Sequence, residues 1–385
     1  MRLLILALFI STVFSATDLY VGYPSQNNNF YTVQAAVNKA ASINPSNEND
    51  RVTIHIAPGT YREQVIINTP YITFINDETS RGTVTITWYY GIGYKYYSAN
   101  SKGYYDANLA MKKSSRNIVS KWGATVQLWN KATYFKASNI IFENSFNRYM
   151  TKEEIDDGVI VSGDTAASPI TYVRTSTSNV NTKEATERAA AMTIEGAYAE
   201  FFSCKFYGSQ DTLYTGASPE FFRKCVIEGQ TDYIFGEANV VFDFCELKWK
   251  GYYGTTYPGY ITAARQGNTQ HYTGYLFNKC RVYGSSQNLS IKAGYLGRPW
   301  ASSAKVMFIN TTLLNGNMIV PEGWYSMSGV KPEDVDGFKE YGTKLRDGTV
   351  VSLSNRKGHA LSADDARTIN KKNYMNNWIP TYLDA

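Results

Sequence analysis

The sequence predicts an all-β protein, a right-handed parallel β-helix with short capping helices at its ends. Three observations support this: a repeat of about 20 residues, short strands in which apolar residues alternate, and frequent Gly and Asn at the turns. A helical solenoid would need two amphipathic helices in each repeat, and the repeats contain none. One continuous core through all coils implies a single domain, which we expect to span residues 17–385.

The clearest repeat pairs CKFYGSQDTLYTG, residues 204–216, with CVIEGQTDYIFGE, residues 225–237. Cysteine, glycine and aspartate recur at the same offsets: Cys204, Gly208 and Asp211 against Cys225, Gly229 and Asp232. A Glu-Phe-Phe triplet precedes each window, at residues 200–202 and 220–222. Weaker copies surround Cys245 and Cys280, and the segments 134–145 and 306–313 resemble the same strand without its cysteine. Residues that share an offset should stack on neighbouring coils.

The ends and interruptions of the coils are also visible in the sequence. Helical patterns over residues 32–41 and 361–370 should cover the terminal coils, whose edge strands would otherwise be exposed. Residues 89–113, rich in Tyr, Gly and Asn, are predicted to form an exposed loop. Residues 148–187 are polar and form a second interruption just before the repeat pair.

Residues 1–16 are typical of a signal peptide, with a basic Arg2, an apolar run from Leu3 to Ile10, and small residues at its end. The alternative is a buried N-terminal helix. We therefore expect a secreted, extracellular monomer with no membrane span. The sequons at Asn288 and Asn310 indicate a glycoprotein if the host secretes through an endoplasmic reticulum. The net charge of +5 favours an acidic polymer as partner, and the absence of a Lys/Arg run argues against nucleic acid.

The four cysteines occupy the same strand position of successive coils and should stack. Stacked cysteines lie near disulfide range, and the predicted pairs are Cys204–Cys225 and Cys245–Cys280. The alternative is a ladder of free, buried thiols. No close Cys-x-x-Cys pair is present, so a zinc site is not expected. We expect no metal and no cofactor.

Asp211 and Asp232 share a repeat offset, so they should lie on neighbouring coils about 4.8 Å apart. Two carboxyl groups at this distance share a proton at intermediate pH. One is then suited to act as nucleophile or base and the other as acid. Gln210 adds an amide donor, and LGRPW, residues 296–300, adds Arg298 and Trp300. The alternative, that both aspartates are turn residues holding backbone amides, stays open from the repeat alone.

Four segments resemble, in order, the signature segments of the pectin methylesterases: GTYREQ (59–64), GSQDTLY (208–214), DYIFG (232–236) and LGRPW (296–300). FYTVQAAV (30–37), ITAARQ (261–266) and the tail from 337 to 380 are also similar to that family. The resemblance covers nearly the whole mature chain. It implies a cell-wall hydrolase that cleaves the methyl esters of pectin, a polygalacturonan, and releases methanol and acidic pectin.

The resemblance also implies roles for individual residues. Asp232 would be the nucleophile that attacks the carboxymethyl carbonyl, and Asp211 the general acid for departing methanol and then the base for water. Gln210 would help to hold the oxyanion, Arg298 would hydrogen-bond the nucleophile, and Trp300 would pack on the sugar. Phe235 and Tyr214 should stack beside the aspartates, either lining the substrate groove or only packing. Ser145 is a further candidate for substrate binding.

One position departs from the family. The family has a glutamine sixteen residues before the cysteine of the next strand, and here that position is Arg188. A guanidinium has both donors and charge, so it could stabilise an oxyanion, or it could pair with Glu187 or an aspartate and disable the site. A non-catalytic pectin-binding protein, disabled at Arg188, is therefore one alternative. A pectate lyase or a polygalacturonase, which share the solenoid, is the other. A serine esterase is disfavoured because no Gly-x-Ser-x-Gly segment is present.

Overall fold

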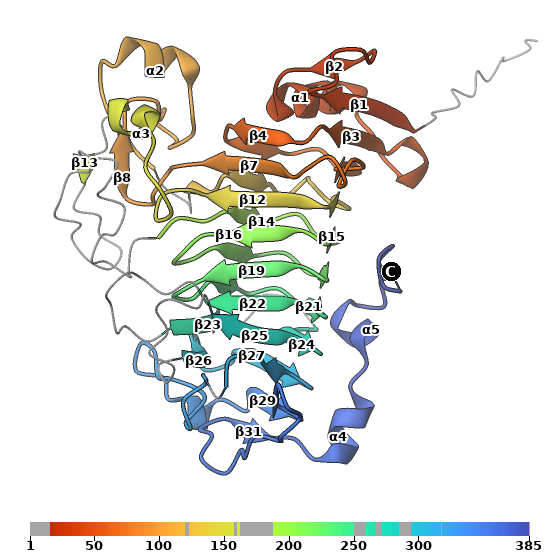
Figure 1. The fold of residues 1–385 in the computed structure, drawn as a ribbon, viewed down its shortest axis with the longest axis vertical. Coiled ribbons are helices and arrows are strands. Elements are labelled where there is room, and N and C mark those ends of the chain that lie inside the picture. Colours follow the sequence, from red (N-terminus) through yellow and green to blue (C-terminus); the bar gives the residue numbers. More distant parts are fainter. Residues whose placement is uncertain are drawn as a thin grey trace, which may run out of the picture.

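The computed structural model describes residues 16–119, 123–157, 160–161, 188–249, 259–265, 271–284, 294–316 and 318–384. Three long parallel sheets extend along one axis, and the chain enters them in turn, coil after coil (Figure 1). The predicted parallel β-helix is confirmed. The predicted signal peptide lies outside the described residues except for Ala16, as do the sequon at Asn288 and most of the polar segment 148–187.

The 12-stranded sheet, called sheet A here, contains in spatial order β2 (Asn29–Phe30), β1 (Thr17–Val21), β3 (Val52–Ile56), β6 (Ile72–Ile75), β11 (Lys136–Ser138), β15 (Ala199–Phe202), β18 (Glu220–Arg223), β21 (Val240–Asp243), β24 (Tyr275–Asn278), β27 (Lys305–Ile309), β29 (Gly337–Tyr341) and β31 (His359–Ala360). The nine-stranded sheet B contains β4 (Gly59–Arg62), β7 (Val84–Trp88), β12 (Ile140–Asn144), β16 (Lys205–Tyr207), β19 (Val226–Gly229), β22 (Glu246–Trp249), β25 (Arg281–Gly284), β28 (Thr312–Leu313) and β30 (Lys344–Leu345). The seven-stranded sheet C contains β5 (Val65–Ile67), β10 (Val126–Leu128), β14 (Met192–Ile194), β17 (Leu213–Thr215), β20 (Ile234–Gly236), β23 (Gly259–Ala264) and β26 (Gly294–Pro299).

The register between coils agrees with the sequence repeat in sheets B and C. Phe206 pairs with Ile227 and Leu213 with Ile234, as their offsets predict. The Glu-Phe-Phe triplets, however, are not equivalent, because Glu200 pairs with Phe221 and Ala199 pairs with Glu220. A shift of one residue moves a strand side chain to the other face of the sheet. Glu220 therefore takes the position of the core residue Ala199, its carboxylate accepts the backbone N–H of Ala217 at 3.3 Å, and burial raises its pKa.

The interior is organised in ladders of identical side chains. A phenylalanine ladder on sheet A is the largest: Phe201, Phe222, Phe242, Phe277 and Phe308 stack with ring centroids 4.7, 4.8, 4.6 and 4.3 Å apart. All five rings are fully buried. Stacked aromatic pairs contribute about 0.5–1.5 kcal/mol each beyond the area that they bury. The ladder therefore links successive coils into one core.

The four cysteines form a second ladder inside the core, but they are free thiols, and the predicted disulfides are wrong. Their coils are in register, since the strand residues after them pair in the order Lys205, Val226, Glu246 and Arg281. In-register coils hold parallel Cβ atoms about 4.8 Å apart, whereas a disulfide needs about 3.8 Å. The thiols of Cys225, Cys245 and Cys280 instead donate to backbone carbonyls of the preceding coil at 3.4 Å.

Helices lie near both ends of the chain, and the N-terminal one covers the first coil. α1 (Val33–Ile43) begins after the N-cap Thr32, whose hydroxyl accepts the N–H of Ala35, and it packs its buried face on the first coil. α4 (Ala363–Thr368) lies in the segment predicted to be helical, but it buries none of its residues, so it does not cover the last coil as expected. After it, α5 (Lys371–Tyr374) and the final residues lie along sheet A (Figure 1), where Tyr374 and Met375 pack on Phe221 and Val241.

The tyrosine-rich segment 89–113 is not the exposed loop that its composition suggests. It contains β8 (Tyr94–Tyr96) and α2 (Ala107–Lys112), and β8 forms a small antiparallel sheet with β9 (Asn117–Ile118) and β13 (Ile160–Val161). Its aromatic side chains are buried in a separate cluster that includes Tyr89, Tyr90, Tyr94, Tyr96 and Phe146. The short helix α3 (Lys152–Asp156) follows, and the 3-10 turns η1 (Glu48–Asp50) and η3 (Pro332–Asp334) complete the elements of the described residues. None of the helices described is long and apolar enough to cross a membrane.

Candidate active site

The two repeated aspartates lie at the turns that lead from sheet B into sheet C. Asp211 precedes β17 and Asp232 precedes β20, and both adopt left-handed backbone conformations with φ of 59° and 48°. Aspartate tolerates this conformation better than most residues. Gln210 bridges to Thr231 in parallel register, and Asp211 donates its N–H to the Thr231 carbonyl at 3.2 Å. The aspartates therefore occupy equivalent positions on adjacent coils, as predicted.

The repeated glycines explain how this turn can be so tight. A Cβ atom on Gly208 would lie 2.6 Å from the hydroxyl of Thr212, and one on Gly229 would lie 2.2 Å from Cβ of Tyr233. Real Cβ atoms do not approach this closely, so only glycine fits at either position. The chain can then fold back within one coil, which brings each aspartate over its neighbour.

Arg298, on β26, pairs with Asp232 through two parallel hydrogen bonds. Its Nε donates to Oδ1 at 2.8 Å and its Nη2 to Oδ2 at 2.5 Å. Such a forked, charge-assisted pair fixes the carboxylate in one orientation. Both Asp232 and Asp211 are largely buried, with 4% and 6% of their surfaces exposed. Arg298 thus compensates the charge of one buried aspartate and leaves the other without an equivalent partner.

The two carboxyl groups have different proton affinities. Burial, together with the nearby charge of Asp232, raises the pKa of Asp211 to about 8, although Arg188, Arg298 and a hydrogen bond from the Gln210 side chain oppose the shift. Burial also raises the pKa of Asp232, but Arg298 opposes that shift with a hydrogen bond and its charge. At neutral pH Asp211 therefore holds its proton, while the pairing with Arg298 favours the ionised form of Asp232.

Arg188 lies on the coil before Asp211 and bridges to Gln210 in parallel register. Arg188 is also the residue that an ungapped count of sixteen residues back from Cys204 identifies in the sequence. Its charge acts on the carboxyl group of Asp211, whose pKa it lowers. Gln210 and Arg188 are thus hydrogen-bond donors on successive coils, on the same side as the aspartates.

The predicted aromatic residues also converge near the aspartates. Tyr214 and Phe235 pair across β17 and β20 with ring centroids 5.2 Å apart, and the Trp300 ring lies 6.3 Å from that of Phe235. These side chains point away from the core that Leu213 and Ile234 face. Phe235 is 2% exposed, so it mainly packs, whereas Tyr214 is half-buried.

The prediction that Ser145 binds substrate must be corrected, because the structure places its side chain in the interior. It is fully buried, and its hydroxyl donates to the carbonyl of Trp88 at 3.2 Å. Ser145 directly follows strand β12 and, being fully buried, cannot contact a substrate at the surface.

Sequence reasoning missed Tyr260 of β23, which lies below the guanidinium of Arg298 at 4.3 Å from the ring centroid. Tyr260 stacks with Tyr295 at 5.4 Å, and Tyr325 completes the cluster. A signal was present: Gly-Tyr occurs at 259–260 and again at 294–295, with the same 35-residue offset as Cys245 and Cys280. Tyr260 packs on the face of the Arg298 guanidinium, whose Nε and Nη2 donate to Asp232.

Within the described residues, no group of three or more His, Cys, Asp or Glu side chains is arranged to hold a metal ion. The ionisable and hydrogen-bonding side chains described at the site are those of the two aspartates, the two arginines and Gln210. A protonated carboxyl next to an ionised, oriented carboxylate can attack an ester and protonate its leaving group.

This chain is similar to several known proteins. The family model described as Pectinesterase matches residues 156–376. A probable pectinesterase A from Neosartorya fischeri is 39% identical over 142 residues, which cover 37% of this chain and 41% of that relative's length. The structure of the pectin methylesterase from Aspergillus niger superposes with a TM-score of 0.64 at 23% identity, covering 94% of this chain and 96% of that one, and this shows a common fold. A pectin methylesterase in complex with a hexasaccharide superposes with a TM-score of 0.63 at 21% identity, covering 94% and 98% of the two chains. Because the family model matches more than half of the chain, the protein belongs to the pectinesterase family.

Proposed function

We propose that this protein is a pectin methylesterase, which hydrolyses the methyl esters of polygalacturonan to methanol and acidic pectin. The observation that carries the proposal is the pair of buried aspartates on adjacent coils, one held by Arg298 and the other with a pKa raised to about 8. Membership of the family and the hexasaccharide complex of a structural neighbour support a pectin substrate.

In the first half of the reaction, an Oδ atom of Asp232 attacks the carboxymethyl carbon and forms a tetrahedral oxyanion. The intermediate collapses as the bond to the methoxy oxygen breaks, and the proton of Asp211 passes to that oxygen, so methanol leaves and an anhydride with Asp232 remains. In the second half, the ionised Asp211 removes a proton from water, and the resulting hydroxide attacks the galacturonyl carbonyl of the anhydride. Asp232 then leaves as a carboxylate, and both aspartates regain their starting protonation states.

Gln210 and Arg188 would donate hydrogen bonds to the oxyanion. They lie on successive coils next to Asp211, and Arg188 replaces the glutamine that the family has at this position. One such donor is typically worth about 3 kcal/mol of the barrier. We expect Arg188→Ala to lower kcat about 100-fold and Arg188→Gln to restore most of the loss, with KM changed little in both. An unchanged kcat in Arg188→Ala would remove the residue from the mechanism.

The function is tested by incubating the protein with methylated pectin while measuring methanol release, acidification and the absorbance of unsaturated products. Methanol with acidification and no unsaturated ends supports the esterase. Unsaturated ends would instead identify a lyase, and no product at all would identify a binding protein disabled at the catalytic site. Asp232→Asn is the matched negative control, since it retains the shape of the side chain but is a poor nucleophile.

We also propose that the protein is secreted and acts as a monomer outside the cell. The N-terminal pattern of Arg2, the apolar run and the small residues that follow supports secretion, and Asn310 is exposed and available to a glycan. When the whole chain is expressed in a eukaryotic host, the protein recovered from the culture medium should begin near Ala16 or Thr17. Retention of residues 1–16 in the secreted product would contradict the cleavage of a signal peptide. A dimeric mass in light scattering would contradict the monomer.

A further inference from the structure

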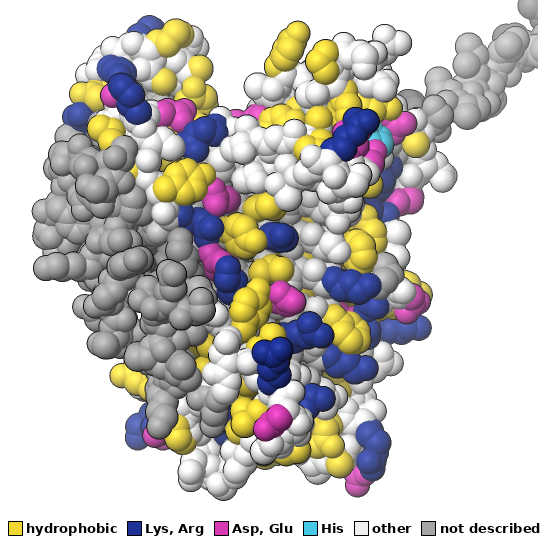
Figure 2. Space-filling model, viewed as in Figure 1, with side chains coloured by type: hydrophobic (Ala, Val, Ile, Leu, Met, Phe, Trp, Pro, Cys, Tyr) yellow, Lys and Arg dark blue, Asp and Glu magenta, His cyan; other side chains and the backbone are white. Residues whose placement is uncertain are grey.

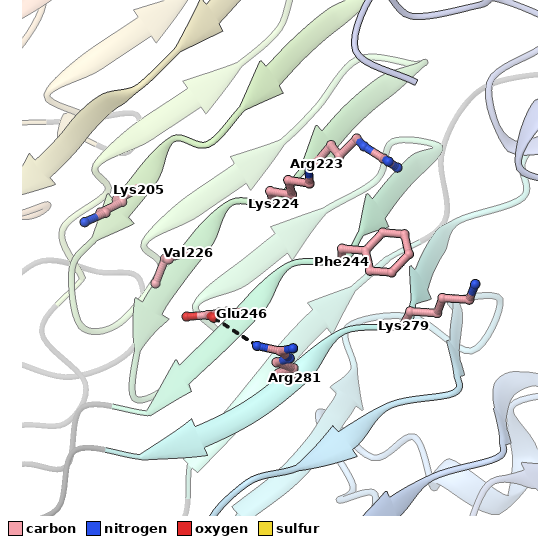
Figure 3. Close-up of a pocket in the computed structure, with 8 residues that line it drawn as sticks. All are labelled: Lys205, Arg223, Lys224, Val226, Phe244, Glu246, Lys279 and Arg281. Atoms are coloured by element: carbon pink, nitrogen blue, oxygen red, sulfur yellow. Dashed lines mark ion pairs between the residues drawn. The ribbon is translucent and has the colours of Figure 1, made fainter. Parts of the chain in front are cut away.

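A basic groove lies on the corner between sheets A and B, where the chain turns from β15, β18, β21 and β24 into β16, β19, β22 and β25. The basic groove is lined by Lys205, Arg223, Lys224, Val226, Phe244, Glu246, Lys279 and Arg281 and has a volume of about 560 Å³. Figure 3 shows that these eight residues come from four successive coils. The active site, in contrast, lies at the other end of the sheet B strands, where they turn into sheet C.

The backbone geometry of this corner explains why its side chains project outwards in a row. Lys224, Phe244 and Lys279 occupy equivalent turn positions of three coils and have left-handed φ values of 52°, 53° and 53°. All three side chains are exposed. Coils repeat about every 4.8 Å, so the side chains of Lys224, Phe244 and Lys279 form a linear array parallel to the solenoid axis.

The basic groove has an excess of positive charge. Five of the residues that line it are basic and one, Glu246, is acidic. Arg281 approaches Glu246 at 3.9 Å, and Arg223 pairs with the buried Asp243, which also binds Lys371 at 3.0 Å. Within the described residues, Lys205, Lys224 and Lys279 have no carboxylate within ion-pair distance. Figure 2 shows the same face, where dark blue side chains gather over these strands with few magenta ones between them.

Phe244 adds an apolar platform at the centre of the array. It is 43% exposed, which is unusual for a phenylalanine on a folded surface. The guanidinium of Arg223 and the ammonium of Lys279 each lie 5.3 Å from its ring centroid, on either side along the axis. An exposed ring between two cations offers a stacking face for a sugar and neighbouring positions for its carboxylates.

We propose that the basic groove binds a run of de-esterified galacturonate residues, the acidic product of the proposed reaction, away from the catalytic site. The choice of this sugar acid rests on the proposed function. A linear array of cations fits a linear polyanion better than a single anion, and Phe244 favours a chain of rings over a flexible acidic peptide. Each ester that is hydrolysed adds a carboxylate to the polymer, so the basic groove would hold the protein to stretches of pectin that it has already processed.

The test uses calorimetric titration of the whole protein with a de-esterified oligogalacturonate of defined length. Lys224→Glu combined with Lys279→Glu should weaken binding at least tenfold, and Phe244→Ala should weaken it severalfold. The matched control is Lys39→Glu combined with Lys102→Glu, which changes the net charge equally at exposed lysines elsewhere. The catalytic site is intact in both double variants, so their difference reports on the basic groove alone.

Two outcomes would overturn the proposal. One is equal affinity of the groove variant and the control variant for the oligogalacturonate. The other is equally tight binding of polyglutamate by the wild-type protein, because it would mean that any polyanion suffices. Methanol release from a short soluble methyl ester is measured in parallel and should be unchanged in both double variants. If the wild-type protein releases no methanol, the proposed function fails, but the binding comparison still decides whether the basic groove takes the sugar acid.

Discussion

Replacing Asp211 by asparagine should make the protein more stable at alkaline pH while it abolishes the proposed acid. The change keeps the size of the side chain and its contact with Gln210 but removes a carboxyl group that is only 6% exposed. The pKa of this group is raised from 3.8 to about 8. At about 1.4 kcal/mol for each tenfold change in proton affinity, ionised Asp211 costs the folded state at most about 6 kcal/mol.

The sign of the pH dependence follows from proton binding. Below pH 3.8 the folded and unfolded chains both hold the proton, so this group contributes no pH dependence to the free energy of unfolding. Between 3.8 and about 8 only the folded chain holds it, and the free energy of unfolding falls as pH rises. Above about 8 neither state holds it, and the loss is complete.

Urea denaturation of the wild type and Asp211→Asn at acidic, neutral and alkaline pH measures this difference. The two proteins should be of similar stability near pH 4, and the variant should be more stable by several kcal/mol near pH 9. Asp336→Asn, at an exposed aspartate on the surface, is the control and should show no such trend. If the difference between Asp211→Asn and wild type changes by less than about 1 kcal/mol over this range, Asp211 is not held protonated by its surroundings.

Three further results are expected. Arg298→Gln should lower kcat at least about 100-fold and destabilise the fold by roughly 3–5 kcal/mol, because Asp232 becomes an unpaired buried charge. Methanol release measures the first effect and urea denaturation the second. Wild-type values for both would argue against the pairing. The rate of methanol release should fall as pH rises through about 8, where Asp211 loses its proton; a rate that stays level to pH 10 would assign the acid to another group. Phe222→Ala should lower the free energy of unfolding by roughly 3–5 kcal/mol, since it removes one ring from the stacked ladder, and a loss below about 1 kcal/mol would show that the coils do not depend on it.

The sequence repeat predicted the parts of the fold that depend on register. A shared offset was enough to place Asp211 over Asp232 and Tyr214 beside Phe235, because a solenoid converts offset directly into adjacency. Arg188 was identified only by comparison with the family's pattern, and its pairing with Gln210 is a finding of the structure. Arg298 could be assigned to Asp232 only through the resemblance to the family. The pairing itself brings together strands that are two coils apart, and no local pattern encodes that contact.

The errors have separate physical causes. Disulfides were expected because stacked cysteines are close, but proximity along a parallel ladder does not bring Cβ atoms near enough for a bond. The matching Glu-Phe-Phe triplets hid a one-residue shift, which the strand register reveals, since Glu220 pairs with Ala199 and not with Glu200. The tyrosine-rich segment 89–113 has a loop-like composition, yet its rings bury one another in a small core, which depends on tertiary packing.

The spacing of the coils has a consequence for how this enzyme family can diversify. Cys204, Cys225, Cys245 and Cys280 keep their ladder although the last step is much longer than the first two. The additional residues enter between β22 and β23 and between β23 and β24, before the strand that carries Arg298. Length can therefore change beside the proposed catalytic residues without disturbing the cysteine ladder of the interior.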